Sequence, residues 1–157
     1  MSFLQYTSYP GMGESLSNRT HYSQSVRLPT HPPTIKISGQ GGWDPVAQHI
    51  IQPTSASQLR AQIDQAFSNV ELALQTAGSK GWSDVYLVRM FYVVDGDAGE
   101  EVGATWKEQM EWMVRVAGEG MRKWCPGHRP LLTAVEVKAL AAERMEVEIE
   151  VEALLEE

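Results

Sequence analysis

Cysteine is nearly absent from this chain of 157 residues, and the single thiol, Cys125, excludes an internal disulfide framework. A lone cysteine is typical of a reducing compartment. No apolar run approaches the roughly 18 residues that span a membrane, and residues 1–18 lack the basic and apolar regions of a secretory signal. We therefore expect a cytoplasmic protein with no membrane partner.

Basic residues are also few, with thirteen Lys and Arg against twenty Asp and Glu and a formal net charge of −7. Proteins that hold nucleic acid normally offer clustered Lys and Arg to the phosphates. Here the basic residues are scattered, and the C-terminal stretch is acidic. The sequence therefore argues against nucleic acid as a partner.

The N-terminal stretch is polar and has no apolar period, so residues 1–19 are predicted to be a flexible or loosely docked leader. The remaining residues, 20–157, have the size of one domain. Residues 21–28 and 34–38 are predicted to pair as a hairpin, because three prolines between them force a turn. Three glycines within four residues predict a loop over residues 39–45.

Two segments have helical periodicity. The first begins at Ser55, which has capping-box spacing to Gln58, and Gly78 has the position of a C-terminal cap. The second is predicted over residues 103–124, where apolar side chains recur every three or four residues through more than five turns. Pro126 follows and ends it.

Three further strands complete the expected order β-β-α-β-α-β-β. Residues 84–94 are apolar on both alternate sets, which predicts a strand covered on both faces. Residues 131–137 form another, and residues 145–151 alternate apolar side chains with glutamates. This order predicts an α+β fold with both helices on one face of the sheet. The other face would be covered by self-association, because monomers rarely expose large apolar patches.

Four segments in this order resemble the YjgF/RidA-like family, which includes reactive-intermediate deaminases. They are Tyr22-Ser23-Gln24; Ile37-Ser38-Gly39-Gln40 with Asp44-Pro45; Leu74-Gln75-Thr76-Ala77-Gly78 before Trp82-Ser83-Asp84-Val85; and Val135-Glu136-Val137 with Val147-Glu148-Ile149-Glu150. The resemblance implies a YjgF-like, or chorismate-mutase-like, mixed sheet with two helices. It also implies a homotrimer with a small-molecule cleft at each subunit boundary.

In the deaminating branch, the cleft binds 2-imino or 2-enamino acids and needs no cofactor or metal. The resemblance places Tyr22, Ser38 and Gly39 in the cleft and assigns the glutamate that positions water to Glu148. The arginine that grips the substrate carboxylate falls on Leu132, which cannot supply a charge-assisted donor. Arg129 lies three residues earlier and replaces it only if Pro130 bends the strand. Low activity on imines of simple amino acids is therefore expected.

Several residues admit a second interpretation. Glu148 also fits one rung of a solvated ladder with the neighbouring glutamates. Cys125 and His128 fit a structural thiol with a nearby imidazole, or a nucleophile pair. Arg89, inside an apolar strand, fits either a salt bridge or the missing cation of the cleft. For Gly39 and the following glycines, a phosphate loop is rejected, because no Lys-Ser/Thr follows.

The alternatives for the whole protein also stay open. The leading hypothesis is a cofactor-free hydrolase (deaminase) or tautomerase acting on an imine, enamine or related carbonyl compound. The second is a non-catalytic ligand-binding or scaffold trimer. The third is an endoribonuclease, which some relatives are named for and which the acidic charge opposes.

Overall fold

The computed structural model describes residues 5–20, 23–28, 32–93 and 99–155. A six-stranded sheet has the order β1-β2-β3-β6-β4-β5. Its strands are β1 (Gln5–Thr7), β2 (Ser25–Leu28), β3 (Thr34–Gly41), β4 (Val85–Tyr92), β5 (Leu131–Glu136) and β6 (Val147–Leu154). Only β4 and β5 pair in parallel among these strands, so the described sheet is mixed.

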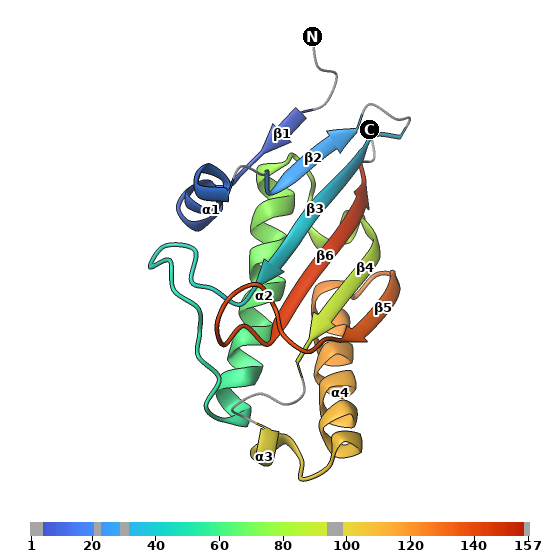
Figure 1. Ribbon diagram of the computed structural model, residues 1–157. Helices are drawn as coiled ribbons and strands as arrows, with labels where there is room; N and C mark the ends of the chain where they lie inside the picture. Colours follow the sequence, from blue (N-terminus) through green and yellow to red (C-terminus); the bar gives the residue numbers. More distant parts are fainter. Residues whose placement is uncertain (1–4, 21–22, 29–31, 94–98, 156–157) are drawn as a thin grey trace.

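Two long helices cover one face of this sheet, behind the strands in Figure 1. The helices are α1 (Met12–Thr20), α2 (Ala56–Thr76), α3 (Gly99–Val102) and α4 (Trp106–Trp124), with a short 3₁₀ helix η1 (Trp82–Asp84) before β4. The predicted α+β fold with two helices on one face is confirmed. None of the described helices is long and apolar enough to cross a membrane.

The helix ends follow local chemistry. Ser55 caps α2 by accepting from the backbone N–H of Gln58 at 3.2 Å, and Gly78 takes φ +91° just beyond its end. Thr105 and Glu108 form a capping box at the start of α4. The predicted start at residue 103 is therefore three residues early, because this second box went unrecognised.

Alternation along β6 builds the core. Val147, Ile149 and Val151 are at most 1% exposed and pack under the helices, while the glutamates between them point to the open face. On α2, Ile63 and Phe67 meet this layer with at most 1% of their surface exposed. Burying side chains of this kind contributes roughly 1.5–3 kcal/mol each.

The N-terminal segment corrects a prediction. Residues 1–19 were expected to be loosely docked, but β1 pairs with β2 and α1 forms within this stretch. Tyr9 is fully buried; its hydroxyl donates to Gln40 Oε1 at 2.9 Å and accepts from Trp43 Nε1 at 2.8 Å. The sequence pattern missed this because one aromatic anchor produces no periodicity.

A second correction concerns the glycines after residue 38. The loop predicted from residue 39 begins later, because β3 continues to Gly41 and pairs with β6 beyond a bulge between Ile37 and Gln40. A side chain at Gly41 would meet Met145 and Trp43, and one at Gly42 would meet the backbone of Gln62. Close packing, rather than flexibility, explains these glycines.

The open face of the sheet is only partly covered within one chain. On β4, Val88 and Met90 are buried under the helices, but Leu87 and Phe91 are half-buried on the open face and Arg89 is exposed. Within one chain the helices cover only one face of β4, and the cover expected from self-association on the other face stays a prediction.

Candidate functional site

Glu148 lies on the open face of β6, in register with Phe91 of β4 and Gly41 of β3. The β3 bulge brings Gly39 so close that a Cβ built there would collide with the Glu148 carboxylate. Any residue with a side chain at this position would displace that carboxylate. The sheet thus holds Glu148 against bare backbone.

This environment changes the acidity of Glu148. Burial, with a smaller contribution from the Glu150 charge, raises the pKa of Glu148 above its ordinary 4.5. Within the described ranges, its carboxylate has no hydrogen-bond or ion-pair partner. Such a group is prepared to accept or return a proton.

The neighbouring glutamates differ from Glu148, so the row is not a uniformly solvated ladder. Glu146 is 5% exposed. Glu152 accepts from Tyr86 Oη at 2.6 Å and pairs with Lys36 Nζ at 3.1 Å. The Tyr86 and Lys36 contacts lower the pKa of Glu152. Among these three carboxylates, only Glu148 is both half-buried and without a hydrogen-bond or ion-pair partner in the described part of the chain.

Ser38 occupies the same bulge, but its hydroxyl is already engaged. It donates to the carbonyl of Gln24 at 2.9 Å, and the Ser38 backbone N–H binds the same carbonyl at 2.8 Å. Gln40 Nε2 donates to the carbonyl of Ser38 at 2.9 Å and also contacts Gln24 Oε1. Through Tyr9 and Gln40, the N-terminal segment therefore fixes the bulge beside Glu148.

Leu132 and Arg129 lie away from Glu148. Leu132 pairs with Val88, whose side chain faces the helices, whereas Glu148 pairs with Phe91 on the opposite face. Leu132 and Arg129 line a surface cavity of about 790 Å³ between the end of α4 and the start of β5. The structure thus brings together Ser38, Gly39 and Glu148, but not the two expected carboxylate-end residues. Tyr22 falls outside the described residues.

A family model described as Endoribonuclease L-PSP matches residues 12–155. The chain belongs to this family. Three solved structures show the same fold. An Entamoeba histolytica protein of the same L-PSP description is 21% identical with a TM-score of 0.71, over 97% of this chain and 99% of that one. RidA from an Antarctic Psychrobacter is 25% identical with a TM-score of 0.63, over 85% and 88%. Escherichia coli TdcF with bound serine is 19% identical with a TM-score of 0.63, over 86% and 88%.

These findings confirm the resemblance to the YjgF/RidA-like family that the sequence segments indicated. A search of curated proteins returns no match. The family model begins at Met12, the first residue of α1, so the L-PSP match includes the whole of this helix, most of which the sequence pattern assigns to the leader.

In this L-PSP family member, the open face carries an ion-pair cluster that sequence reasoning missed. Arg89 lies 3.7 Å from Glu150 and 3.5 Å from Glu152, with 44% of its side chain exposed. Of the two interpretations of Arg89, the salt bridge is the one that the structure bears out, although at the surface. Lys36 and Tyr86 join through Glu152. Only the cross-strand register could have revealed this cluster.

Cys125 and His128 do not form a nucleophile pair. The Cys125 thiol is 4% exposed and contacts the Trp82 carbonyl at 3.9 Å, and burial raises its pKa to about 11, which keeps it protonated. The His128 ring instead hydrogen-bonds the Val85 carbonyl at 2.7 Å. The described residues contain no cluster of three or more His, Cys, Asp or Glu suited to a metal ion.

Proposed function

We propose that this protein is a cofactor-free enzyme that deaminates or tautomerises an imine, enamine or related carbonyl compound in clefts between subunits of a homotrimer. Glu148 carries the proposal, because it combines partial burial, a raised pKa and the absence of a partner among the described residues. A carboxyl group of this kind accepts a proton from an attacking water and returns it to the departing amine. For tautomerisation, the same group moves a proton between two atoms of the ligand.

Gly39 supports this role by leaving room for the reacting group. The position at which a Cβ would collide with the Glu148 carboxylate lies at a bulge, where strand pairing is locally interrupted. A small ligand beside the bulge would meet the Glu148 carboxyl group where it packs against the β3 backbone. Ser38, whose hydroxyl bonds to backbone carbonyls, would shape this wall.

The opposite orientations of Glu148 and Leu132 support a site between subunits. Residues on opposite faces of one sheet cannot contact the same small molecule within one chain. Glu148 of one copy and the Leu132 cavity of another could meet across a boundary. The exposed apolar side chains of β5 provide a surface for such a contact, since Leu131 is 68% exposed and Val135 42% exposed.

The test follows the decay of imines generated in the assay by an amino-acid oxidase. Glu148→Gln keeps the size of the side chain and removes its proton chemistry. It should lower kcat by about 10²- to 10⁴-fold, the usual contribution of general acid–base catalysis. Glu150→Gln is the matched control, because Glu150 lies on the same face two residues away and pairs with Arg89.

Each result has a definite meaning. Loss of turnover in Glu148→Gln alone supports the assignment. Loss in Glu150→Gln alone would transfer the catalytic role to Glu150. Because low activity is expected on imines of simple amino acids, the assay includes imines with an apolar or uncharged group in place of the carboxylate. If wild-type protein accelerates the decay of none of them but binds one, the non-catalytic binding trimer is correct and the enzyme proposal fails.

A further inference from the structure

The bulge in β3 is held in place from the side of β2 rather than by β6. Pairing with β6 is interrupted between Ile37 and Gln40, so Ser38 and Gly39 fall outside the regular ladder. The Ser38 N–H and hydroxyl instead bind the Gln24 carbonyl, at 2.8 and 2.9 Å. The Ser38 carbonyl accepts from Gln40 Nε2 at 2.9 Å. The position of the bulge therefore depends on how the Gln40 side chain is oriented.

A one-way chain of hydrogen bonds orients this side chain. The Trp43 indole N–H can only donate, and it donates to the Tyr9 hydroxyl at 2.8 Å. The hydroxyl proton is then directed to Gln40 Oε1, at 2.9 Å. Because the oxygen of the Gln40 amide faces Tyr9, its NH2 group faces the Ser38 carbonyl and Gln24 Oε1. The Tyr9 hydroxyl thus determines which end of the Gln40 amide meets the bulge.

The residues that follow Tyr9 keep its ring in place. A Cβ built on Gly13 would lie 2.9 Å from the ring, and one built on Gly11, which has φ +82°, would collide with the Pro45 carbonyl. These glycines let α1 begin directly against the loop after β3, where the Met12 N–H donates to the same carbonyl at 2.9 Å. The N-terminal segment is therefore docked through a fully buried aromatic side chain that also orders the bulge.

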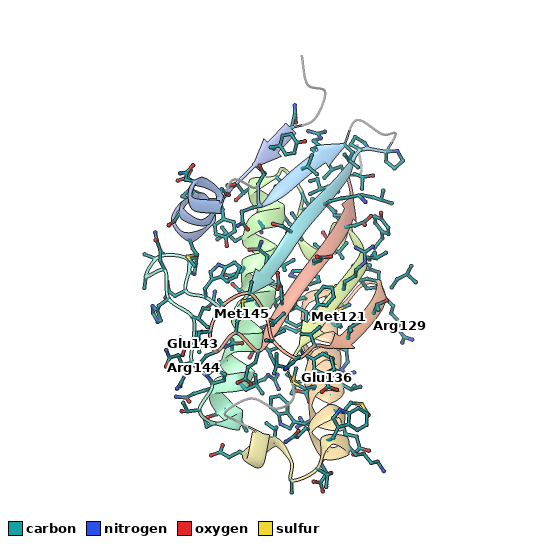
Figure 2. The ribbon with its side chains drawn as sticks, viewed as in Figure 1. Met121, Arg129, Glu136, Glu143, Arg144 and Met145 are labelled. Carbon is teal, nitrogen blue, oxygen red and sulfur yellow. The ribbon has the colours of Figure 1, made fainter. Side chains whose placement is uncertain are left out.

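The far end of β3 has separate support. Asn69 of α2 donates to the carbonyls of Gly41 and Trp43, both at 2.8 Å. Met145, which Figure 2 shows beside the end of β3, lies where a side chain at Gly41 would be. Release of Tyr9 would therefore move the bulge without moving the end of the strand that follows it.

We infer that Tyr9 and Gln40 are positioning residues for Glu148, and that docking of the N-terminal segment activates the site. With the network intact, the Gly39 backbone lies against the Glu148 carboxylate. When Tyr9 is released, the bulge relaxes and the carboxylate moves into solvent. This release needs no global unfolding, because β1 is an edge strand and α1 is short. The role in turnover rests on the proposed function, whereas the control of the Glu148 environment does not.

The first measurement follows the Glu148 carboxyl carbon by NMR during an acid titration of the full-length protein, with Glu148→Gln to assign the signal. Burial raises the pKa of Glu148 in the wild type, so in Tyr9→Phe this pKa should fall toward 4.5 as the carboxylate meets water. Gly13→Ala should act in the same direction, because its methyl group displaces the Tyr9 ring without removing a hydrogen-bonding atom. Val116→Ala, at a 1% exposed position of α4, is a destabilised control and should leave the titration unchanged.

The second measurement is turnover of an imine that the wild-type protein accepts. Tyr9→Phe should lower kcat by about tenfold or more with KM nearly unchanged, because a displaced catalytic group weakens the transition state rather than substrate binding. The low-pH limb of kcat should move to lower pH together with the Glu148 pKa. Val116→Ala should change neither.

Each outcome decides a separate part of the inference. An unchanged Glu148 titration in both Tyr9→Phe and Gly13→Ala would overturn it, as would an equal shift in Val116→Ala. A shifted titration with unchanged kcat would overturn the role of the network in turnover. If the wild-type protein turns over no imine, the enzyme proposal fails, and the titration alone still decides whether the N-terminal segment controls Glu148.

Discussion

Glu148 owes its environment to a missing side chain on the neighbouring strand. Because Gly39 lacks a Cβ, the carboxylate packs against β3 backbone and is withdrawn from water. Removing water raises the free energy of the charged form, so the folded protein binds the Glu148 proton more tightly than the unfolded chain does. This one residue therefore links stability to pH.

The first prediction is that Glu148→Gln stabilises the protein near neutral pH. Below the ordinary pKa of 4.5, the carboxyl group is neutral in both folded and unfolded states and costs little. As the pH rises through the raised folded pKa, the buried charge destabilises the fold, and glutamine avoids this. Melting temperatures of both proteins should show a larger gain for the variant at about pH 7 than at about pH 4. An equal loss of stability at both pH values would contradict the burial of the carboxylate.

The second prediction compares two glycines. Gly39→Ala should displace the Glu148 side chain, which can swing away, and so reduce activity with little effect on melting temperature. Gly42→Ala should instead destabilise the fold by about 1–3 kcal/mol, because its Cβ would meet the Gln62 backbone, which cannot move freely. Thermal unfolding and imine turnover of both variants measure the contrast. Intact turnover in Gly39→Ala would show that Glu148 does not need its present position.

At the scale of the elements, the N-terminal segment is a structural part of the site. Its Tyr9 hydroxyl links Gln40 of β3 to Trp43 of the following loop, and Gln40 in turn binds the Ser38 carbonyl. The hydroxyl makes these bonds in a fully buried position. An unsatisfied buried polar group costs more than the hydrogen bond itself contributes.

The third prediction follows from this network. Tyr9→Phe should lower the free energy of unfolding by about 1–3 kcal/mol, because Trp43 Nε1 and Gln40 Oε1 both lose their partner. Tyr9→Ala should cost about 3–5 kcal/mol, since it also leaves a cavity. Chemical denaturation measures both, with Tyr6→Phe as a control at a side chain that is 58% exposed. A Tyr9→Phe variant as stable as wild type would mean that the segment is docked only loosely.

At the scale of the whole molecule, β5 is the exposed edge of the sheet. It pairs only with β4 among the described strands, and all six of its residues are exposed. Leu131 and Val135 lie on the open face in register with Leu87 and Phe91 of β4. Monomeric proteins usually protect such an edge with charge, whereas β5 carries a charge only at its last residue, Glu136.

The fourth prediction is that Leu131→Glu converts the proposed trimer to a monomer without unfolding it. The charge would be exposed in the single chain but would have to be buried without a partner in the assembly. Light scattering reports the mass, and circular dichroism reports the fold. Val46→Glu is the matched control, at an 86% exposed apolar residue in a loop. A wild-type monomer at micromolar concentration would reject the assembly and the site between subunits.

The sequence by itself determined those helices and strands in which the spacing of apolar residues shows which side chains are buried. Alternation along β6 and the three-to-four spacing along α2 and α4 record which side chains face the core, so the α+β order and the one-sided helices were predictable. The four short segments described above, in their order along the chain, indicated the family. Glu148 was also proposed from sequence, and its place in the site remains a prediction.

Only the tertiary structure decided which residues meet. Three contacts depend on strand order and register. They are the docking of Tyr9, the close approach of Gly39 to the Glu148 carboxylate, and the ion pairs of Arg89 with Glu150 and Glu152. These contacts join residues far apart in the chain, and local periodicity carries no record of them. For the same reason, the sequence did not reveal that Leu132 and Glu148 of one chain lie on opposite faces of the sheet, and their meeting in a cleft between subunits stays a prediction. A one-residue change of register exchanges the faces, and only paired strands determine it.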